Sequence, residues 1–206
     1  MGYDLLIHGG TIVTPNGRFP GQVAVLGGKI AAILSPEVEA EAKETYDATG
    51  LYVLPGLIDA HVHFRDPGFT EKEDFETGTR SAAAGGITMV IDMPNVSPPT
   101  TTAANLEEKL RAISPKAGVD FGLFSVLVEE NEGEMAALVK GGVAGFKIYI
   151  GTSVGNIAAP QDGRMLSQLS QAAKLGYRTG FHAENNEIND FCTAALQKAG
   201  EEDPSC

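Results

Sequence analysis

From Leu51 onward, short apolar segments alternate with longer, Ala-rich amphipathic segments, and this alternation restricts the possible folds more than any other feature of the sequence. Strands buried on both faces are apolar throughout, and helices commonly end at glycine. The pattern therefore predicts five successive strand–helix units, with a capping box of Thr70 and Glu73 before the first helix. The expected strands are LYVLPGLIDAHVH, ITMVIDMP, FGLFSVLV, GFKIYI and RTGFHA, and the expected helices lie near residues 71–84, 102–113, 131–140, 164–175 and 186–199.

Successive units of this kind form an α/β fold around a parallel sheet, and the order is typical of a TIM-type β/α barrel. A closed barrel has eight units and about 250 residues. The residues that follow the first 54 suffice for only five units, and the final EEDPSC is a polar loop that leads to no further strand. We expect a portion of a longer protein whose C-terminal part is absent, and an open five-stranded sheet is the alternative.

The first 54 residues follow a different pattern, in which short apolar runs are separated by turn signals such as Asn16-Gly17 and Gly27-Gly28. This pattern predicts a small β unit. His8 belongs to it and has no acidic residue or cysteine nearby in the sequence, so we interpret it as structural.

Charge and composition exclude several classes of function. The formal net charge is -12, and Lys and Arg never cluster, which argues against a nucleic-acid partner. No apolar run approaches the roughly 18 residues of a membrane span. The two cysteines, Cys192 and Cys206, and the lack of a signal-like start favour a cytoplasmic protein without a disulfide framework.

Polar residues gather where the expected strands end, which is where the active site of a β/α barrel lies. His61 and His63 are alternate residues of one strand, so both imidazoles face one side while Val62 and Phe64 face the other. Three of the four histidines occupy such positions, a distribution that favours a metal site over solvent-facing side chains. Strand by strand, the residues are His61 and His63, then Asp92 and Asn95, then Lys147, then His182.

Lys147 lies inside the apolar strand GFKIYI, where a buried amine needs a partner. One interpretation is a salt bridge to Asp92 or Glu184. The other is a neutral amine that has reacted with carbon dioxide to form a carbamate, which is a carboxylate able to bridge two metals. The spacing leaves both interpretations open.

Four segments, PGLIDAHVHFRDPG, MPNVSPPTTT, FKIYIGTSVGN and FHAEN, resemble the cyclic amidohydrolases of the amidohydrolase superfamily, and most closely the dihydroorotases. The resemblance implies a metal-dependent hydrolase barrel with a β-sandwich portion, acting on a small cyclic amide. On this basis residues 1–54 are the N-terminal part of the β-sandwich domain, and residues 55–206 are the first five β/α units of the barrel.

The resemblance also implies a ligand set. His61 and His63 correspond to ligands of the more buried metal, Lys147 to a bridging N6-carboxylysine, and His182 to a ligand of the second metal. The expected ions are zinc, two per complete chain. The family's further histidine ligand and its general-base aspartate come from later strands, beyond Cys206, so no catalytic residue is identifiable within this sequence.

Arg65 and Asn95 are the expected substrate contacts, because a guanidinium binds a carboxylate well and dihydroorotate carries one. The prediction is therefore a dihydroorotase, which interconverts L-dihydroorotate and N-carbamoyl-L-aspartate in pyrimidine biosynthesis. The alternative for Arg65 is a salt bridge to Asp66, Glu71 or Asp74. The alternative for Asn95 is that it only stabilises a turn.

Other functions remain open at this point. An allantoinase or a hydantoinase/dihydropyrimidinase shares the metal ligands, and a non-catalytic structural subunit or inactive fragment would explain the missing units. GTSVGN lacks the pattern of a phosphate-binding loop and is expected to be a flexible loop beside the active site. We expect a homo-oligomer, because an incomplete barrel exposes apolar edges that need covering.

Overall fold

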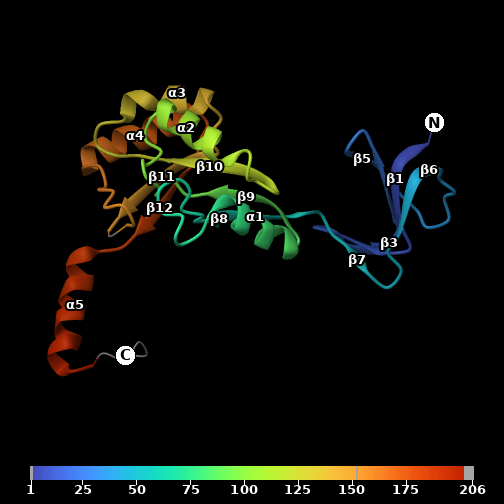
Figure 1. Ribbon diagram of the computed structural model, residues 1–206, viewed down its shortest axis with the longest axis horizontal. Coiled ribbons are helices and arrows are strands. Elements are labelled where there is room, and N and C mark those ends of the chain that lie inside the picture. Colours follow the sequence, from blue (N-terminus) through green and yellow to red (C-terminus); the bar gives the residue numbers. More distant parts are fainter. Residues whose placement is uncertain (1, 152, 202–206) are drawn as a thin grey trace. The chain divides into compact units, whose positions relative to one another are not determined.

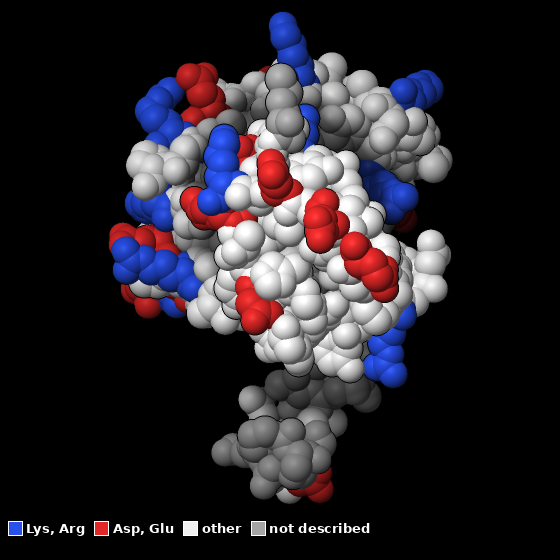
Figure 2. Space-filling model, turned by 90° about the vertical axis from the view of Figure 1, so that its right-hand side faces the viewer, with Lys and Arg blue, Asp and Glu red and all other residues white. Residues whose placement is uncertain are grey.

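The computed structural model describes residues 2–151 and 153–201, so the expected polar loop at 202–206, with Cys206, lies outside the described residues. The chain forms two compact units, Met1–Leu57 and Ile58–Cys206 (Figure 1). Within the described ranges, no helix combines the length and the apolar character needed to span a membrane. On the face drawn in Figure 2, acidic side chains are scattered among uncharged ones, and Lys and Arg lie toward the margin without forming a continuous patch.

The first unit contains two small sheets, as the turn-rich pattern predicts. Leu6 and Ala24 of the larger sheet and Ile12 of the smaller one are buried. His8 ends its strand, is partly buried and lies opposite Asp47. The four-stranded sheet has the order β5 (Lys29–Leu34), β4 (Gln22–Leu26), β1 (Tyr3–His8) and β6 (Ala42–Asp47), and the three-stranded sheet has the order β3 (Gly17–Pro20), β2 (Thr11–Thr14) and β7 (Tyr52–Val53).

The second unit is built on a five-stranded sheet, whose order β12-β11-β10-β9-β8 is the reverse of the chain order. Neighbouring strands from β9 to β12 pair in parallel, as expected for successive β/α units. The strands are β8 (Leu57–Val62), β9 (Ile87–Asp92), β10 (Asp120–Val126), β11 (Gly145–Ile150) and β12 (Thr179–Ala183). The helices are α1 (Phe75–Ala84), α2 (Ala103–Ile113), α3 (Met135–Lys140, preceded by the 3-10 turn η1, Glu132–Glu134), α4 (Asp162–Lys174) and α5 (Asn186–Ala199).

Helices α1 to α4 contribute to one continuous apolar core with the sheet. Side chains along the strands alternate between this core and the opposite face of the sheet. On β11, Phe146 and Ile148 are fully buried in this core, whereas Lys147 and Tyr149 belong to the opposite face of the strand. Helix α5 differs from the others, because none of its residues is buried.

Two sequence-based boundaries are wrong. The expected strand LYVLPGLIDAHVH is two separate strands, β7 and β8, because Pro55 lacks the N–H that a continuous ladder needs. Helix α1 begins later than expected, with Asp74 as its N-cap in place of the Thr70–Glu73 capping box. The Asp74 carboxylate accepts a hydrogen bond from the Thr77 N–H at 2.8 Å, which satisfies a free amide of the first turn.

Candidate functional site

A cavity of about 160 Å³ lies where strands β8, β11 and β12 end. Nine residues line it, and they include all six residues that the sequence suggested as metal ligands or substrate contacts. Pockets for drug-sized molecules are roughly 300–1,000 Å³, so this cavity suits a small ring. The lining residues are His61, His63, Arg65, Asn95, Lys147, Tyr149, Ser153, Val154 and His182.

His61 in β8 and His63 just after it face this cavity together. Val62 and Phe64, between and after them, pack into the core on the helix side, which confirms the expected alternation. The ring centroids of His61 and His63 are 5.2 Å apart. Burial lowers the pKa of both imidazoles, and the nearby charges of Lys147 and His182 lower the pKa of His61 further. Both rings are therefore held in the neutral form that binds metals.

Asn95 fixes the orientation of the His63 ring. The distance from His63 Nδ1 to Asn95 Oδ1 is 2.8 Å. An amide oxygen can only accept, so Nδ1 carries the proton and Nε2 keeps a free lone pair. Metal-binding histidines commonly have such a partner on the second ring nitrogen. Asn95 is 4% exposed, and its suggested contact with the substrate stays a prediction.

Arg65 also lines the cavity, and it forms no salt bridge with Asp66, Glu71 or Asp74, the carboxylates considered from the sequence. Its Nη1 donates to the Asn95 carbonyl oxygen at 3.3 Å. Asp66 pairs with Lys116 at 2.8 Å, and Asp74 caps α1. Within residues 2–151 and 153–201, Arg65 forms no ion pair. Its guanidinium donors remain available to a bound molecule.

Lys147 is 3% exposed, and burial lowers the pKa of its amine. Its Nζ lies 5.4 Å from the centroid of the Tyr149 ring. The suggested salt bridges to Asp92 and Glu184 are absent from the described part of the chain. Asp92 has the same parity on β9 as buried Val90, so its carboxylate lies on the helix side and binds Lys109 of α2 instead. A buried, easily neutralised amine fits the chemistry of a carbamate.

Two polar atoms at the cavity lack hydrogen-bond partners. The Tyr149 hydroxyl is buried without one, and so is His182 Nε2, although Glu184 Oε1 lies 2.8 Å from that nitrogen. The Tyr149 and His182 ring centroids are 6.1 Å apart. Because buried polar groups in native proteins are normally paired, such atoms indicate a place for a ligand.

Sequence reasoning missed Tyr149. Its position two residues after Lys147 on the same strand was the available signal, because alternate residues share a face. The loop GTSVGN contributes Ser153 and Val154 to the lining, whereas its Thr152 lies outside the described residues.

The side chains fit a metal only if Lys147 takes part. Among the described residues, no three His, Cys, Asp or Glu side chains gather closely enough to hold an ion. The imidazoles at the cavity therefore need a further anionic donor, and an oxygen donor on Lys147 is the candidate within the cavity lining.

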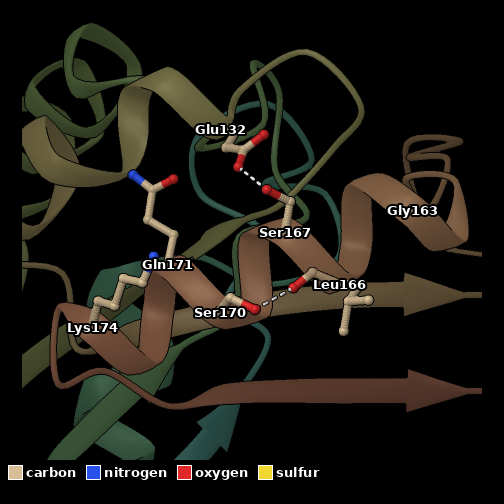
Figure 3. Close-up of a pocket in the computed structure, with 7 residues that line it drawn as sticks. All are labelled: Glu132, Gly163, Leu166, Ser167, Ser170, Gln171 and Lys174. Atoms are coloured by element: carbon tan, nitrogen blue, oxygen red, sulfur yellow. Dashed lines mark hydrogen bonds between the residues drawn. The ribbon is translucent and has the colours of Figure 1, made fainter.

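A larger groove of about 530 Å³ runs along α4, but Glu132, Ser167 and Ser170 in its lining are already paired (Figure 3). Glu132 accepts hydrogen bonds from Ser167 and Arg164. Ser170 Oγ donates to the Leu166 carbonyl oxygen at 2.9 Å. No histidine lines this groove. The smaller cavity is therefore the candidate site.

Comparisons with known proteins identify the family of the chain. The model of the amidohydrolase family matches residues 52–204. An allantoinase from Rubrobacter xylanophilus is 43% identical over 91% of this chain and 41% of its own length, and one from Deinococcus radiodurans is 38% identical over 97% and 45%. An L-hydantoinase (dihydropyrimidinase) structure from Arthrobacter aurescens has a TM-score of 0.90 at 34% identity and covers 98% of this chain. The chain spans less than half the length of these relatives.

These findings overturn the prediction of a dihydroorotase and of a role in pyrimidine biosynthesis, because the relatives are named allantoinase and the structural neighbours hydantoinase. The error has a physical origin. Arg65 suggested a carboxylate substrate, but its guanidinium donates to a carbonyl oxygen here, and carbonyl groups are common to every cyclic amide. The five-stranded parallel sheet is part of a TIM-barrel-like metal-hydrolase fold, and the chain belongs to the amidohydrolase family.

Proposed function

We propose that this chain carries the metal-binding part of an allantoinase, an enzyme that hydrolyses a ring amide of allantoin. The observation that carries the proposal is the cavity at the strand ends, where side chains from β8, β11 and β12 meet. Relatives named allantoinase at 38–43% identity support this substrate over other cyclic amides.

In the proposed site, His61, His63 and His182 supply neutral imidazole nitrogens, and Lys147 supplies oxygens as a carbamate. The carbamate forms when the neutral Nζ attacks carbon dioxide and loses one proton, so burial of Lys147 favours its formation. Zinc is the proposed ion, as a pair in the complete enzyme. When bound, the metal supplies Lewis acidity for the attack of water on a ring carbonyl.

The chain's own residues orient the substrate. The Arg65 guanidinium is a donor at the cavity, and allantoin offers carbonyl oxygens both on its ring and on its ureido substituent. A neutral, carbonyl-rich substrate needs no carboxylate partner. Asn95 holds the His63 ring and thereby keeps one imidazole nitrogen directed away from the amide.

A hydantoinase is the second candidate, and the likeness to the L-hydantoinase structure favours it. The two substrates differ in the substituent on a shared ring. A ureido group offers a carbonyl oxygen to the Arg65 guanidinium at the cavity, whereas an alkyl substituent offers none. This difference favours allantoin.

The test is an assay of the complete zinc-loaded enzyme that contains this chain, prepared with bicarbonate, on allantoin, an alkyl-substituted hydantoin and dihydroorotate. We expect hydrolysis of allantoin at a rate at least about tenfold above that of the hydantoin, because a polar group left unpaired costs about 1–3 kcal/mol. His63→Ala should abolish the reaction and His8→Ala, outside the cavity, should preserve it. A protein that binds no zinc and hydrolyses none of the three would support a non-catalytic role instead.

A further inference from the structure

Behind the candidate site lies a buried ion pair with no place in the proposed chemistry. Lys109 of α2 is 1% exposed, Asp92 at the end of β9 is fully buried, and Lys109 Nζ lies 2.5 Å from Asp92 Oδ2. The pair sits beside apolar core residues such as Leu106 and Ile113. Removing two charges from water costs several kcal/mol per ion, so such a pair adds little stability over apolar side chains of the same size.

The pair reaches the metal-binding strand through Asp92. The other carboxylate oxygen, Oδ1, accepts a hydrogen bond from the Phe64 N–H at 2.9 Å. Phe64 is the residue between His63 and Arg65. One residue further along, the Met93 N–H donates to the Val62 carbonyl oxygen at 2.9 Å. The backbone on both sides of His63 is therefore held by residues 92 and 93.

The same segment then holds the His63 side chain. Asn95 Oδ1 accepts from His63 Nδ1 at 2.8 Å, and the Asn95 carbonyl oxygen accepts from Arg65. Lys109 Nζ lies 3.3 Å from the Met93 carbonyl oxygen as well as binding Asp92. Lys109 thus fixes the start of segment 92–95, and this segment fixes both the backbone and the ring of His63.

We propose that Lys109 is a positioning residue, which holds His63 in the orientation that metal binding requires by anchoring Asp92 and Met93 to helix α2. The inference rests on the proposed metal site. It assigns a role to a residue that contacts neither the cavity nor any of the suggested ligands directly.

A purely structural role for Lys109 is the competing explanation, and the chain offers a control in a second lysine–aspartate pair, whose aspartate is buried and whose lysine is 38% exposed. Lys116 pairs with Asp66, another buried carboxylate, at 2.8 Å. Asp66 also follows the metal-binding strand, but its carboxylate accepts from the Phe75 N–H at the start of α1 and not from the backbone beside His63. Loss of Lys116 should disturb a comparable buried acid without releasing the imidazole.

The first experiment measures zinc affinity by competition with a chromophoric chelator, for the wild type, Lys109→Met and Lys116→Met. Removal of a group that orients a metal ligand typically lowers affinity by roughly 10–100-fold. We expect such a loss for Lys109→Met and less than about a threefold change for Lys116→Met. Where Lys109→Met fails to fold, the double variant Asp92→Asn with Lys109→Met removes both charges, and the same loss is expected. An affinity equal to that of the wild type would overturn the inference.

The second experiment needs no metal. Nitrogen-15 NMR of the imidazoles in the metal-free protein reports which nitrogen of His63 carries the proton, with His63→Ala identifying its signals. The wild type should show the Nδ1–H tautomer that Asn95 imposes, and Lys109→Met should show a mixture of tautomers, while Lys116→Met should not. If the wild type binds no zinc but the tautomer still depends on Lys109, the metal site fails and the positioning role stands. If the tautomer is unchanged in Lys109→Met, the positioning role is wrong.

Discussion

Gly78 lies in the middle of α1, where the helix packs on the ring of Phe64, and we predict that Gly78→Ala destabilises the protein. A Cβ atom at this position would lie 2.5 Å from Phe64 Cδ1 and from Cε1. Carbon atoms normally approach to about 3.5–4.0 Å, so the ring or the helix must move by about 1 Å. Phe64 is 8% exposed and packs edge-on against Phe75 with centroids 5.1 Å apart, which leaves the ring little room.

The expected magnitude is the difference of two effects. Overpacking a core costs about 1–3 kcal/mol, and replacing glycine by alanine inside a helix gains about 0.5–1 kcal/mol. The net loss should lie between about 0 and 2.5 kcal/mol in the free energy of unfolding. Gly163 of α4 is the matched control, because a Cβ there meets no atom within 4 Å. Gly163→Ala should stabilise by up to about 1 kcal/mol.

The assay is urea unfolding of both variants, followed by far-ultraviolet circular dichroism. The described helices all belong to the unit Ile58–Cys206, so the signal reports on the unit that contains the site. If Gly78→Ala were as stable as Gly163→Ala, α1 would not pack closely on Phe64. The account of how the end of β8 is held would then fail.

Four further predictions concern the cavity. Asn95→Ala removes the partner of His63 Nδ1 and should lower zinc affinity by roughly 10–100-fold in a chelator competition, and an unchanged affinity would count against the ring orientation. Because burial lowers the pKa of His61 and of His63, both rings in the metal-free protein should take up protons only at lower pH than an ordinary imidazole, and proton NMR that shows either ring titrating at or above the ordinary pH would contradict the shifts. The metal-free protein should lose stability as the pH falls below 6.5, because unfolded imidazoles take up protons first. Tyr149→Phe removes a buried, unpartnered hydroxyl, so the metal-free protein should gain up to about 1 kcal/mol in urea unfolding, and a loss of stability would show that the hydroxyl has a partner in the free protein.

The strand–helix order and the position of the candidate site could be predicted from the sequence because both depend on local periodicity. The two-residue period of a strand places His61 and His63 on one side and Val62 and Phe64 in the core. Parallel strands end on the same side of a sheet, which brings Lys147 and His182 to the same cavity.

What could not be predicted depends on contacts between elements. Asp92 lies at a strand end like the other polar residues. Its side chain points to the helix side of the sheet, because it has the same parity as the buried residues of β9, and there it pairs with Lys109 of α2. The start of α1 depended on which of several acidic residues could reach a free amide, and Asp74 did so. The prediction of the substrate class was wrong for a related reason. An arginine such as Arg65 binds carboxylates and carbonyl groups alike, so it cannot by itself distinguish dihydroorotate from allantoin.

The central claim is that Lys147, as a carbamate, supplies oxygen donors to the proposed metal site, with His61 and His63 on one ion and His182 on the other. Carbon-13 NMR of the protein equilibrated with labelled bicarbonate tests it most directly, with and without zinc. The account predicts a carbamate signal that zinc strengthens and that Lys147→Met abolishes. A spectrum without a zinc-dependent carbamate signal, or a signal that persists in Lys147→Met, would contradict it.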